Sequence, residues 1–315
     1  MKKTIDLRGL TQGIVIRSVG SSSRVKTEDG KQYDCIIRGK FRIEGLNTTN
    51  PVAVGDEVLF SGHEEGETGV IQEILPRKNY ILRKAIAHSH KVHILAANID
   101  QAILLFTIDQ PVTSTGFANR FLVVAEAYHI PAKIVINKID LLNSPEQKER
   151  LEEITDLYSR IGYEVIHVSS RDSSYQSRAA ELLTGKISFI GGHSGSGKST
   201  FINLADPDLD IKTSEVSEYS NKGVHTTTFA EMHPLAGGGY IIDSPGIKEL
   251  GITDFERTDL SHYFPEMQEL MSECKFNNCT HTNEPKCAIK AAVEAGEIHA
   301  SRYDSYLRML EETEG

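Results

Sequence analysis

The chain has 315 residues, of which 39% are hydrophobic and 25% are charged, and its formal net charge is −10. Its length favours two or three domains, and its composition provides enough apolar side chains for a sizeable core. The acidic balance argues against indiscriminate nucleic-acid binding over the whole surface, and no stretch approaches the roughly 18 consecutive apolar residues of a membrane span.

The amino-terminal part of the chain, residues 1–75, contains short β-segments separated by turn signals. The clearest of these segments are 13–17, 33–38, 54–60 and 69–75. Five such strands in this length suit a small barrel, so we expect an OB-fold β-barrel domain.

The next segment differs from the rest of the chain in its charge. Residues 75–99 include no acidic residue and five basic ones, which are Arg77, Lys78, Arg83, Lys84 and Lys91. Charge alone favours a solvated linker face for such a run. We therefore expect a basic linker over 76–97.

From residue 98 the pattern changes to alternating strands and helices, in a domain expected to extend to residue 252. Residues 102–106 form a continuous apolar run, which is typical of a strand buried in a parallel sheet. Further strands are expected at 132–136, 164–168, 187–190 and 239–243, with helices at 117–129, 145–161, 177–184 and 200–205. Such alternation predicts a doubly wound α/β domain with its ligand at the carboxyl ends of the strands. Residues 253–315 are expected to form a helical domain.

A phosphate-binding loop is predicted between one of these strands and the following helix. Residues 192–199 match the pattern G-x-x-x-x-G-K-[ST] in full. Its glycines let successive backbone N–H groups point at phosphate oxygens, Lys198 would reach the β- and γ-phosphates, and the Ser199 hydroxyl would bind Mg²⁺. The predicted nucleotide-binding residues here are Gly192, His193, Ser194, Gly195, Ser196, Gly197, Lys198, Ser199 and Thr200.

A base-reading loop is predicted at the end of the strand 132–136, where residues 137–140 read Asn-Lys-Ile-Asp. The Asp140 carboxylate can accept hydrogen bonds from guanine N1–H and its 2-amino group, whereas adenine would leave this carboxylate unpaired. Asn137 can bond to the purine edge, and the stem of Lys138 would lie along the base. After the next strand, the backbone N–H groups of Ser169 and Ser170 could contact guanine O6, at a place where many GTPases have Ser-Ala.

Two switch segments are expected after the phosphate loop. Asp243 is placed to hold Mg²⁺ through water, and the Gly246 N–H to meet the γ-phosphate. Among the three threonines at 226–228, Thr227 is the predicted Mg²⁺ ligand. Ras-like GTPases orient the attacking water with a Gln after this glycine, but Ile247 stands here. We therefore hypothesise that His225 positions the water; the alternative is an ordinary surface histidine.

The order of these motifs is unusual. Ras-like domains begin with the phosphate loop, continue with the switches and end with the base-reading loops. Here the base-reading loops at 137 and 169 precede the phosphate loop at 192 and the switches near 226 and 243. The sequence therefore predicts a circularly permuted P-loop GTPase domain whose motifs still converge in space. Switch II then leads directly into the C-terminal segment, so movement at Gly246 could be passed to it.

A Cys/His cluster interrupts the helical C-terminal segment. Three thiolates and one imidazole would provide a closed tetrahedral set for one structural Zn²⁺, formed by Cys274, Cys279, His281 and Cys287. The spacing is not that of a standard zinc finger, and the alternative is three free cysteines in a helical region. A cluster this dense favours zinc, because disulfides do not persist in the reducing cytoplasm in which we expect this protein.

Taken together, these motifs resemble the circularly permuted small ribosomal subunit biogenesis GTPases, the RsgA family. The resemblance rests on N-K-I-D, G-H-S-G-S-G-K-S, K-G-V-H-T-T-T, D-S-P-G-I and C-K-F-N-N-C-T-H-T-N-E-P-K-C, and covers essentially the whole chain. It implies an N-terminal OB domain, a permuted GTPase domain and a C-terminal α-helical zinc-binding domain. It also implies GTP hydrolysis that is stimulated by the small ribosomal subunit, in late maturation of that subunit, with rRNA contacts on the barrel and on residues 77–91.

Two other functions remain open on the sequence. A nucleotide-gated RNA-binding module would use GTP and GDP only to set its affinity, and its turnover would not respond to ribosomal subunits. A generic P-loop ATPase or kinase is opposed by Asp140, which favours guanine. No heptad or exposed apolar stripe argues for more than a monomer.

Overall fold

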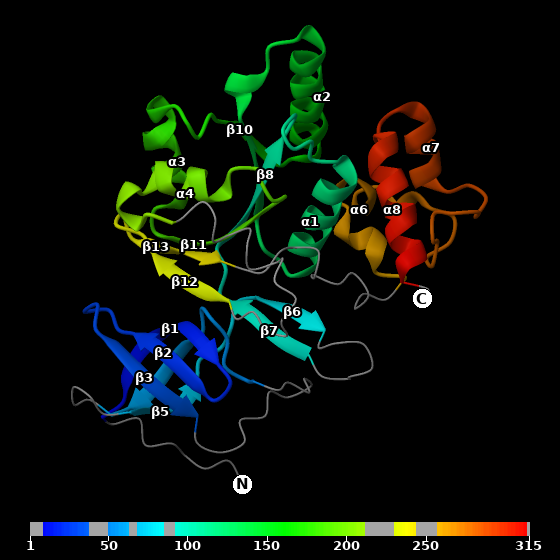
Figure 1. Ribbon diagram of the computed structural model, residues 1–315. Coiled ribbons are helices and arrows are strands. Elements are labelled where there is room, and N and C mark those ends of the chain that lie inside the picture. Colours follow the sequence, from blue (N-terminus) through cyan, green and yellow to red (C-terminus); the bar gives the residue numbers. More distant parts are fainter. Residues whose placement is uncertain are drawn as a thin grey trace, which may run out of the picture. The chain divides into compact units, whose positions relative to one another are not determined.

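The computed structural model (Figure 1) describes residues 9–37, 50–62, 68–84, 92–211, 230–243 and 257–313, with residues 83, 84, 92, 93 and 243 described by their backbone only. The contacts divide the chain into two compact units. The first holds the described parts of 1–100, 180–190 and 206–245, and the second holds those of 101–179, 191–205 and 246–315.

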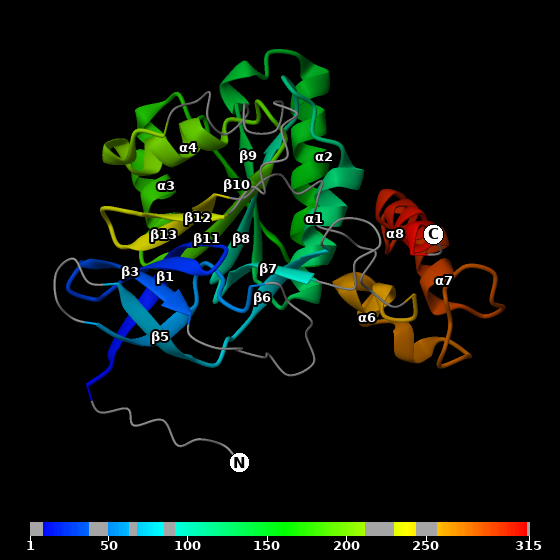
Figure 2. The same ribbon diagram turned by 60° about the horizontal axis from the view of Figure 1, so that its bottom comes forward.

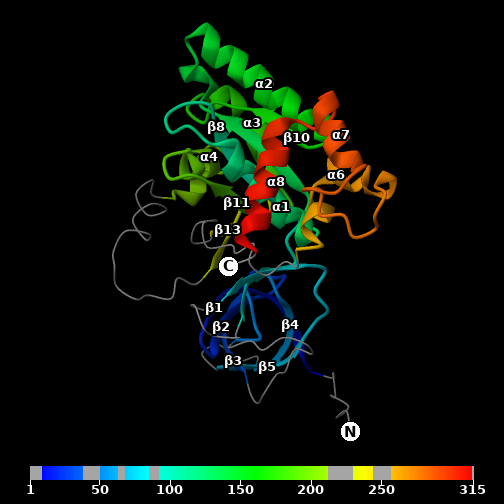
Figure 3. The same ribbon diagram turned by 90° about the vertical axis from the view of Figure 1, so that its right-hand side faces the viewer.

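The first unit contains a closed five-stranded barrel (Figure 3). Its strands are β1 (Thr11–Val19), β2 (Ser22–Lys26), β3 (Gln32–Ile37), β4 (Glu57–Ser61) and β5 (Gly69–Ile74). They pair in the order β1-β2-β3-β5-β4, and a further β1–β4 pairing closes the ring. Alternate side chains point inward and form a core that includes Val15, Val25, Cys35, Val58, Phe60 and Ile71. The predicted barrel is confirmed.

The segment 76–97 is not the solvated linker that its charge suggested. It contains β6 (Tyr80–Lys84) and β7 (Val92–Ala97), which pair antiparallel. The side chain of its first basic residue, Arg77, is only 9% exposed and forms an ion pair with the buried Asp56 at 2.6 Å. The Ala97 N–H donates to Val54 O at 2.8 Å, so this segment packs against the barrel. The charge-based prediction failed because apolar residues of both strands, such as Ile81, are buried.

Three more strands belong wholly or largely to the first unit. These are β11 (Lys186–Gly192), β12 (Glu231–Pro234) and β13 (Gly239–Asp243). β11 pairs parallel with β13, and β12 pairs antiparallel with β13. The sequence analysis predicted β11 and β13 but missed β12, which is only four residues long and ends at a proline. A short 3₁₀ turn, η3 (Pro207–Leu209), follows β11 and precedes β12 in the sequence.

The second unit contains a parallel sheet in the order β10-β9-β8. Its strands are β8 (Gln101–Thr107), β9 (Ala132–Asn137) and β10 (Glu164–His167), and its helices include α1 (Thr115–Ala127), α2 (Pro145–Ile161), α3 (Gln176–Leu183, partly in the first unit) and α4 (Lys198–Ala205). Every residue of β8 is buried, as its apolar run predicted. Helix α1 packs on β8 and β9, and α2 on β10 (Figure 2).

The ends of α2 show why its predicted bounds of 145–161 are correct. Ser144 forms a capping box with Gln147, and Pro145 occupies the first helical turn. Gly162 ends the helix in the left-handed conformation at φ 106°. Residues close in sequence therefore mark both ends of this helix.

The described C-terminal residues fold onto α1 within the second unit. They form η6 (Leu260–Tyr263), α6 (Pro265–Gln268), η7 (Met271–Glu273), α7 (Ala288–Ala295) and α8 (Ala300–Glu312). Helix α8 lies along α1. Among the helices that the structure describes, none is long and apolar enough to cross a membrane.

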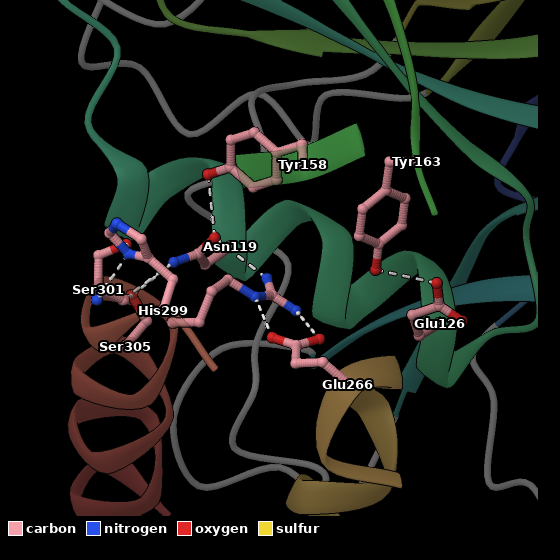
Figure 4. A network of polar contacts seen from close by, with 9 residues as sticks. Asn119, Glu126, Tyr158, Tyr163, Glu266, His299, Ser301 and Ser305 are labelled. Atoms are coloured by element: carbon pink, nitrogen blue, oxygen red, sulfur yellow. Dashed lines mark hydrogen bonds and ion pairs between the residues drawn. The ribbon is translucent and has the colours of Figure 1, made fainter. Parts of the chain in front are cut away.

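A buried polar network connects α8 with α1 and α2 (Figure 4). Arg302, which is 0% exposed, donates to both carboxylate oxygens of Glu266 at 2.5 and 3.0 Å and to Asn119 Oδ1 at 3.1 Å. Tyr158 donates to the same Asn119 oxygen at 3.0 Å, and Asn119 Nδ2 donates to Ser305 Oγ at 2.8 Å. The network satisfies buried polar groups from elements that are far apart in sequence.

Candidate nucleotide site and metal centre

The predicted phosphate loop links β11 to α4, as its sequence required. Its turn depends on glycine, because Gly195 and Gly197 adopt φ +80° and +94°, which L side chains rarely adopt. At Gly192 a Cβ atom would lie 2.7 Å from Ser196 Oγ and 2.8 Å from Leu105 O, so only glycine fits. The loop therefore has the backbone conformation that allows consecutive N–H groups to face an anion.

The lysine of this loop folds back over it. Lys198 begins α4 and its Nζ donates to Gly192 O at 2.8 Å and to His193 O at 2.9 Å. Ser199, at the next position, is buried in the first turn of the helix, and Thr200 is half-buried beside it. These contacts hold the ammonium group of Lys198 at the loop that would receive the phosphates.

The base-reading loop meets the phosphate loop directly. Asn137 is the last residue of β9, and its Nδ2 donates to Ser196 O at 2.9 Å. Lys138 adopts φ 64° and its Nζ donates to Gly195 O at 2.7 Å and to Gln110 O. Burial lowers the pKa of Lys138, and the charge of Arg171 lowers it further. Residues almost 60 positions apart thus converge in the way that the permuted order predicted.

Asp140 lies in η1 (Ile139–Leu141), just beyond this contact, and its side chain is exposed. An exposed carboxylate at this position is available to accept hydrogen bonds from a ligand. The structure places Asp140 on the same loop as Asn137 and Lys138, as the N-K-x-D pattern requires.

The second base-reading loop also joins this cluster. The Ser170 N–H donates to Asn137 Oδ1 at 3.0 Å, and the Ser170 hydroxyl donates to the same oxygen at 2.8 Å. The sequence analysis expected this N–H to be open for guanine O6, whereas here it is paired with Asn137. The hydroxyl of Ser169 is buried and has no hydrogen-bond partner among the described residues.

Two contacts at this site were not predicted. The ring of Phe117, on α1, stacks on His193 with centroids 4.0 Å apart and planes 28° apart. The carbonyl of Gln110, in the loop between β8 and α1, accepts from Lys138. The sequence carries no signal for either contact, since Phe117 falls within a helical pattern and every residue has a carbonyl.

The remaining predicted nucleotide residues lie in segments that the structure covers only in part. Asp243 ends β13, where its backbone pairs with Glu231. His225, Thr227 and Gly246 lie outside the described residues. Their roles therefore stay predictions.

The Cys/His cluster forms a compact donor set within the second unit. The ligand atoms of Cys274, Cys279, His281 and Cys287 all lie within 4.8 Å of one another. His281 Nδ1 is 3.7 Å from Cys274 Sγ and 3.4 Å from Cys287 Sγ. Tetrahedral zinc with Zn–S and Zn–N bonds of about 2.3 and 2.0 Å separates S and N by about 3.5 Å, which matches these distances.

The protonation of this cluster also fits a metal. Burial, followed by the neighbouring thiols of Cys287 and Cys274, raises the pKa of Cys279 to about 12. The Cys279 thiol would therefore remain protonated at neutral pH without a cation. A divalent cation reverses this preference, because it binds thiolates.

The loop that carries the ligands is held by hydrogen bonds from both of its sides. The Glu284 carboxylate accepts from Thr280 N and Oγ1 at 2.7 and 2.6 Å and from Thr282 N at 3.0 Å. Burial by itself raises the pKa of Glu284, but these hydrogen bonds lower it to about 2. From α8, Tyr303 donates to His281 O at 2.6 Å and Tyr306 donates to Thr280 O at 2.7 Å.

Comparisons with known proteins agree with this architecture. The family model of the RsgA GTPase matches residues 74–253, and that of the RsgA N-terminal domain matches residues 12–71. The chain is 50% identical over 302 residues to a protein of Christiangramia forsetii named small ribosomal subunit biogenesis GTPase RsgA, covering 95% of this chain and 96% of the relative. A relative of the same name from Flavobacterium johnsoniae is 50% identical over 301 residues, covering 95% and 92%.

Solved structures show the same fold. The structure of YloQ, described as a circularly permuted GTPase, has a TM-score of 0.75 at 31% identity, covering 99% of this chain and 98% of that one. The structure of YjeQ from Thermotoga maritima has a TM-score of 0.78 at 35% identity, covering 97% and 99%. The identity, the coverage and the convergence of the described motifs agree, and the chain belongs to the RsgA family of circularly permuted GTPases.

Proposed function

We propose that this protein hydrolyses GTP to GDP and phosphate, is stimulated by the small ribosomal subunit, and acts in late maturation of that subunit. The observation that carries the chemical part is the hydrogen bonding of Asn137 and Lys138 to the phosphate loop, which brings the base-reading and phosphate-binding motifs into one site. The biological part is supported by the names of the relatives, which are small ribosomal subunit biogenesis GTPases.

In this proposal the two base-reading loops select guanine over adenine. Asp140 accepts hydrogen bonds from N1–H and the 2-amino group of guanine, and Asn137 bonds to the purine edge. The loop at Ser169 and Ser170 closes the other side of the base. Adenine would leave the carboxylate without donors, and this cost excludes ATP.

Phosphate binding falls to the loop 192–199 and to the start of α4. Its backbone N–H groups surround the phosphate oxygens, and Lys198 leaves its carbonyl partners to reach the β- and γ-phosphates. Ser199, Thr227 and Asp243 would hold Mg²⁺, with Asp243 acting through water. When bound, Mg²⁺ supplies neutralisation of the charge that develops on the phosphates.

Catalysis requires a water molecule aligned with the γ-phosphate. We assign its orientation to His225, because Ile247 replaces the glutamine of Ras-like domains. The Gly246 N–H would donate a hydrogen bond to the γ-phosphate, and this hydrogen bond would be lost after hydrolysis. Switch movement would then pass to the C-terminal helical segment.

The domains have separate roles in this account. We propose an OB-fold ribosome-binding domain at 1–75, a GTPase domain at 98–252 and a zinc-binding helical domain at 253–315, with residues 76–97 packed against the barrel rather than forming a linker. Basic residues of the barrel and of 77–91 would contact rRNA phosphates, since only one face need be positive on an acidic protein. Cys274, Cys279, His281 and Cys287 would hold one structural Zn²⁺, which cross-links the loop. We further propose a cytoplasmic monomer.

Nucleotide selectivity tests the chemical part. Asp140→Asn is expected to weaken turnover of GTP and to favour XTP, because xanthine presents an oxygen where guanine has its 2-amino donor. Asp156→Asn is the matched control, since Asp156 is an exposed residue of α2 that forms a surface ion pair with Arg160. Unchanged preference for GTP over ATP and XTP in Asp140→Asn would remove the assignment.

A further inference from the structure

Strand β12, in the first unit, lies between the barrel and the strand that leads into the predicted switch II. On one side it pairs with β13 over its whole length, beginning with Glu231 opposite Asp243. On the other side Glu231 lies opposite Arg17 of β1. The pairing of β1 with β4 ends at Ile14, and β12 continues along the same edge of β1. The barrel and the strand of Asp243 are therefore joined through one short strand.

One cross-strand row runs from the predicted Mg²⁺ ligand to the outer face of the barrel. Beyond Arg17 the row continues with Arg24 of β2 and Asp34 of β3. Its order is thus Asp243, Glu231, Arg17, Arg24 and Asp34. Side chains directly opposite one another in antiparallel strands lie on the same face, with Cβ atoms about 5 Å apart. From Glu231 to Asp34 this register places two arginines between two carboxylates.

Side chains also connect the barrel with both strands of the β12–β13 hairpin. The hydrogen bond and the charge of Asp34 raise the pKa of Arg24, and the carboxylate of Glu231 on β12 raises it further. Lys26 Nζ lies 5.5 Å from the centre of the Tyr240 ring on β13. These contacts add charge and ring interactions to the single backbone pair between β1 and β12.

The hairpin is anchored at its closed end and continues into both predicted switches at its open end. At the closed end the buried carboxylate of Asp206 accepts from the Ala236 N–H at 2.6 Å. The predicted switch threonines at 226–228 precede β12 in the sequence, and Asp243 ends β13. A displacement of either switch would therefore act first on the open end, where Glu231 meets the barrel.

We infer that Arg17 and Glu231 are positioning residues for Mg²⁺-dependent nucleotide binding, which act on Asp243 through the β1–β12–β13 ladder. Opposite charges in a cross-strand pair stabilise the pairing of β1 with β12. The ladder between β12 and β13 then holds the backbone of Asp243 in register. The inference rests on the proposed function, in which Asp243 holds Mg²⁺. Because coupling between two sites is reciprocal, a ligand on this barrel face and Mg²⁺–GTP would change each other's affinity.

Reversal of charge at position 17 tests this role. In Arg17→Glu two carboxylates oppose each other, whereas Arg17→Glu/Glu231→Arg restores an opposite pair in reversed order. Both variants have glutamate at 17, so they differ only at 231 and share the same contact with Arg24. Dissociation constants of a non-hydrolysable GTP analogue would be measured by calorimetry for the full-length proteins, with Mg²⁺ and with EDTA.

The quantity compared is the gain in affinity that Mg²⁺ produces. Arg17→Glu is expected to reduce this gain about two- to fivefold, the range for a cross-strand charge pair, and the double variant to restore most of it. Hydrogen exchange of the β12 and β13 amides in the nucleotide-free protein gives a second readout that needs no metal. These amides are expected to exchange faster in Arg17→Glu by a similar factor, and at close to the wild-type rate in the double variant.

Lys133→Glu is the matched control, because it places two carboxylates opposite each other in another cross-strand pair. Lys133 of β9 lies opposite Glu164 of β10 and forms an ion pair with it at 2.5 Å, in the other unit. This variant is expected to keep the wild-type gain from Mg²⁺ and the wild-type exchange of β12 and β13.

An unchanged gain from Mg²⁺ in Arg17→Glu, or a loss in the double variant as large as in the single one, would overturn the inference. An equal loss in Lys133→Glu would overturn it as well, because any disturbed cross-strand pair would then have the same effect. A wild type that binds the analogue equally well with and without Mg²⁺ would instead contradict the proposed Mg²⁺ site. A wild type that does not bind the analogue would contradict the proposed function as a whole.

Discussion

Replacement of Arg302 by methionine is expected to loosen α8 from α1. Methionine has a similar length but no charge, so the change leaves Glu266 without its cationic partner at a site where the glutamate side chain is 12% exposed. Removal of one partner from a buried ion pair costs about 3–5 kcal/mol. The contact of the guanidinium with the Phe264 ring, at 4.7 Å, would be lost too.

Hydrogen exchange of α8 amides measures this local cost. A loss of at least about 3 kcal/mol corresponds to exchange that is more than about 100-fold faster, provided that α8 opens locally. Arg120→Met is the matched control, because Arg120 also joins α1 to α8 by an ion pair, with Glu312, but both side chains are partly exposed. A surface pair of this kind is expected to contribute about 1 kcal/mol at most.

The double variant Arg302→Met/Glu266→Met tests the cause of the lost protection. It distinguishes the uncompensated charge of Glu266 from loss of the other contacts of Arg302. Replacement of both charges by apolar groups removes the uncompensated carboxylate, so most of the lost protection should return. Equal exchange rates in the single and double variants would refute the view that an orphaned Glu266 causes the loss. A change in Arg302→Met no larger than that in Arg120→Met would show that burial does not strengthen this pair.

Three further predictions concern the site and the cluster. Gly197→Ala is expected to abolish measurable GDP binding, because the new Cβ would overlap Asn137 Nδ2 and L side chains strain at φ +94°; affinity within tenfold of wild type would contradict the geometry. Metal analysis of the purified protein should find about one zinc per chain and markedly less in Cys287→Ala, whereas equal zinc in both would exclude this cluster as the site. The carboxylate of Glu284 has its pKa lowered to about 2, so its stabilising effect is present above about pH 4.3, the unfolded value, and is lost as the pH falls toward 2. The difference in thermal stability between wild type and Glu284→Gln should therefore be large at pH 6 and shrink toward pH 3, and a difference independent of pH would argue against this account.

Local patterns predicted most of the α/β elements, since each depends on residues close in sequence. The apolar run of β8 and the capping residues of α2 are examples, and the structure has both elements at the expected positions. The phosphate loop and the Asn137–Asp140 loop were found for the same reason. Their glycines and polar residues are required by local backbone geometry and by ligand chemistry.

Contacts between distant residues could not be predicted. The Arg302 network joins residues 119, 158, 266 and 302, and nothing in their separate surroundings marks them as partners. The pairing of Ser170 with Asn137 is of the same kind, and it became visible only when β9 and the loop after β10 were placed side by side. In residues 76–97 the basic charges suggested a solvated linker. The segment instead forms β6 and β7, because its apolar side chains are buried.

Steady-state GTP hydrolysis, measured with and without purified small ribosomal subunits and with ATP as the control substrate, tests the central claim most directly. The account predicts slow basal turnover of GTP, a severalfold or greater increase when subunits are added, and no turnover of ATP. GTP turnover that is indifferent to the subunits would contradict the proposed role in ribosome maturation, and comparable hydrolysis of ATP would contradict the guanine site.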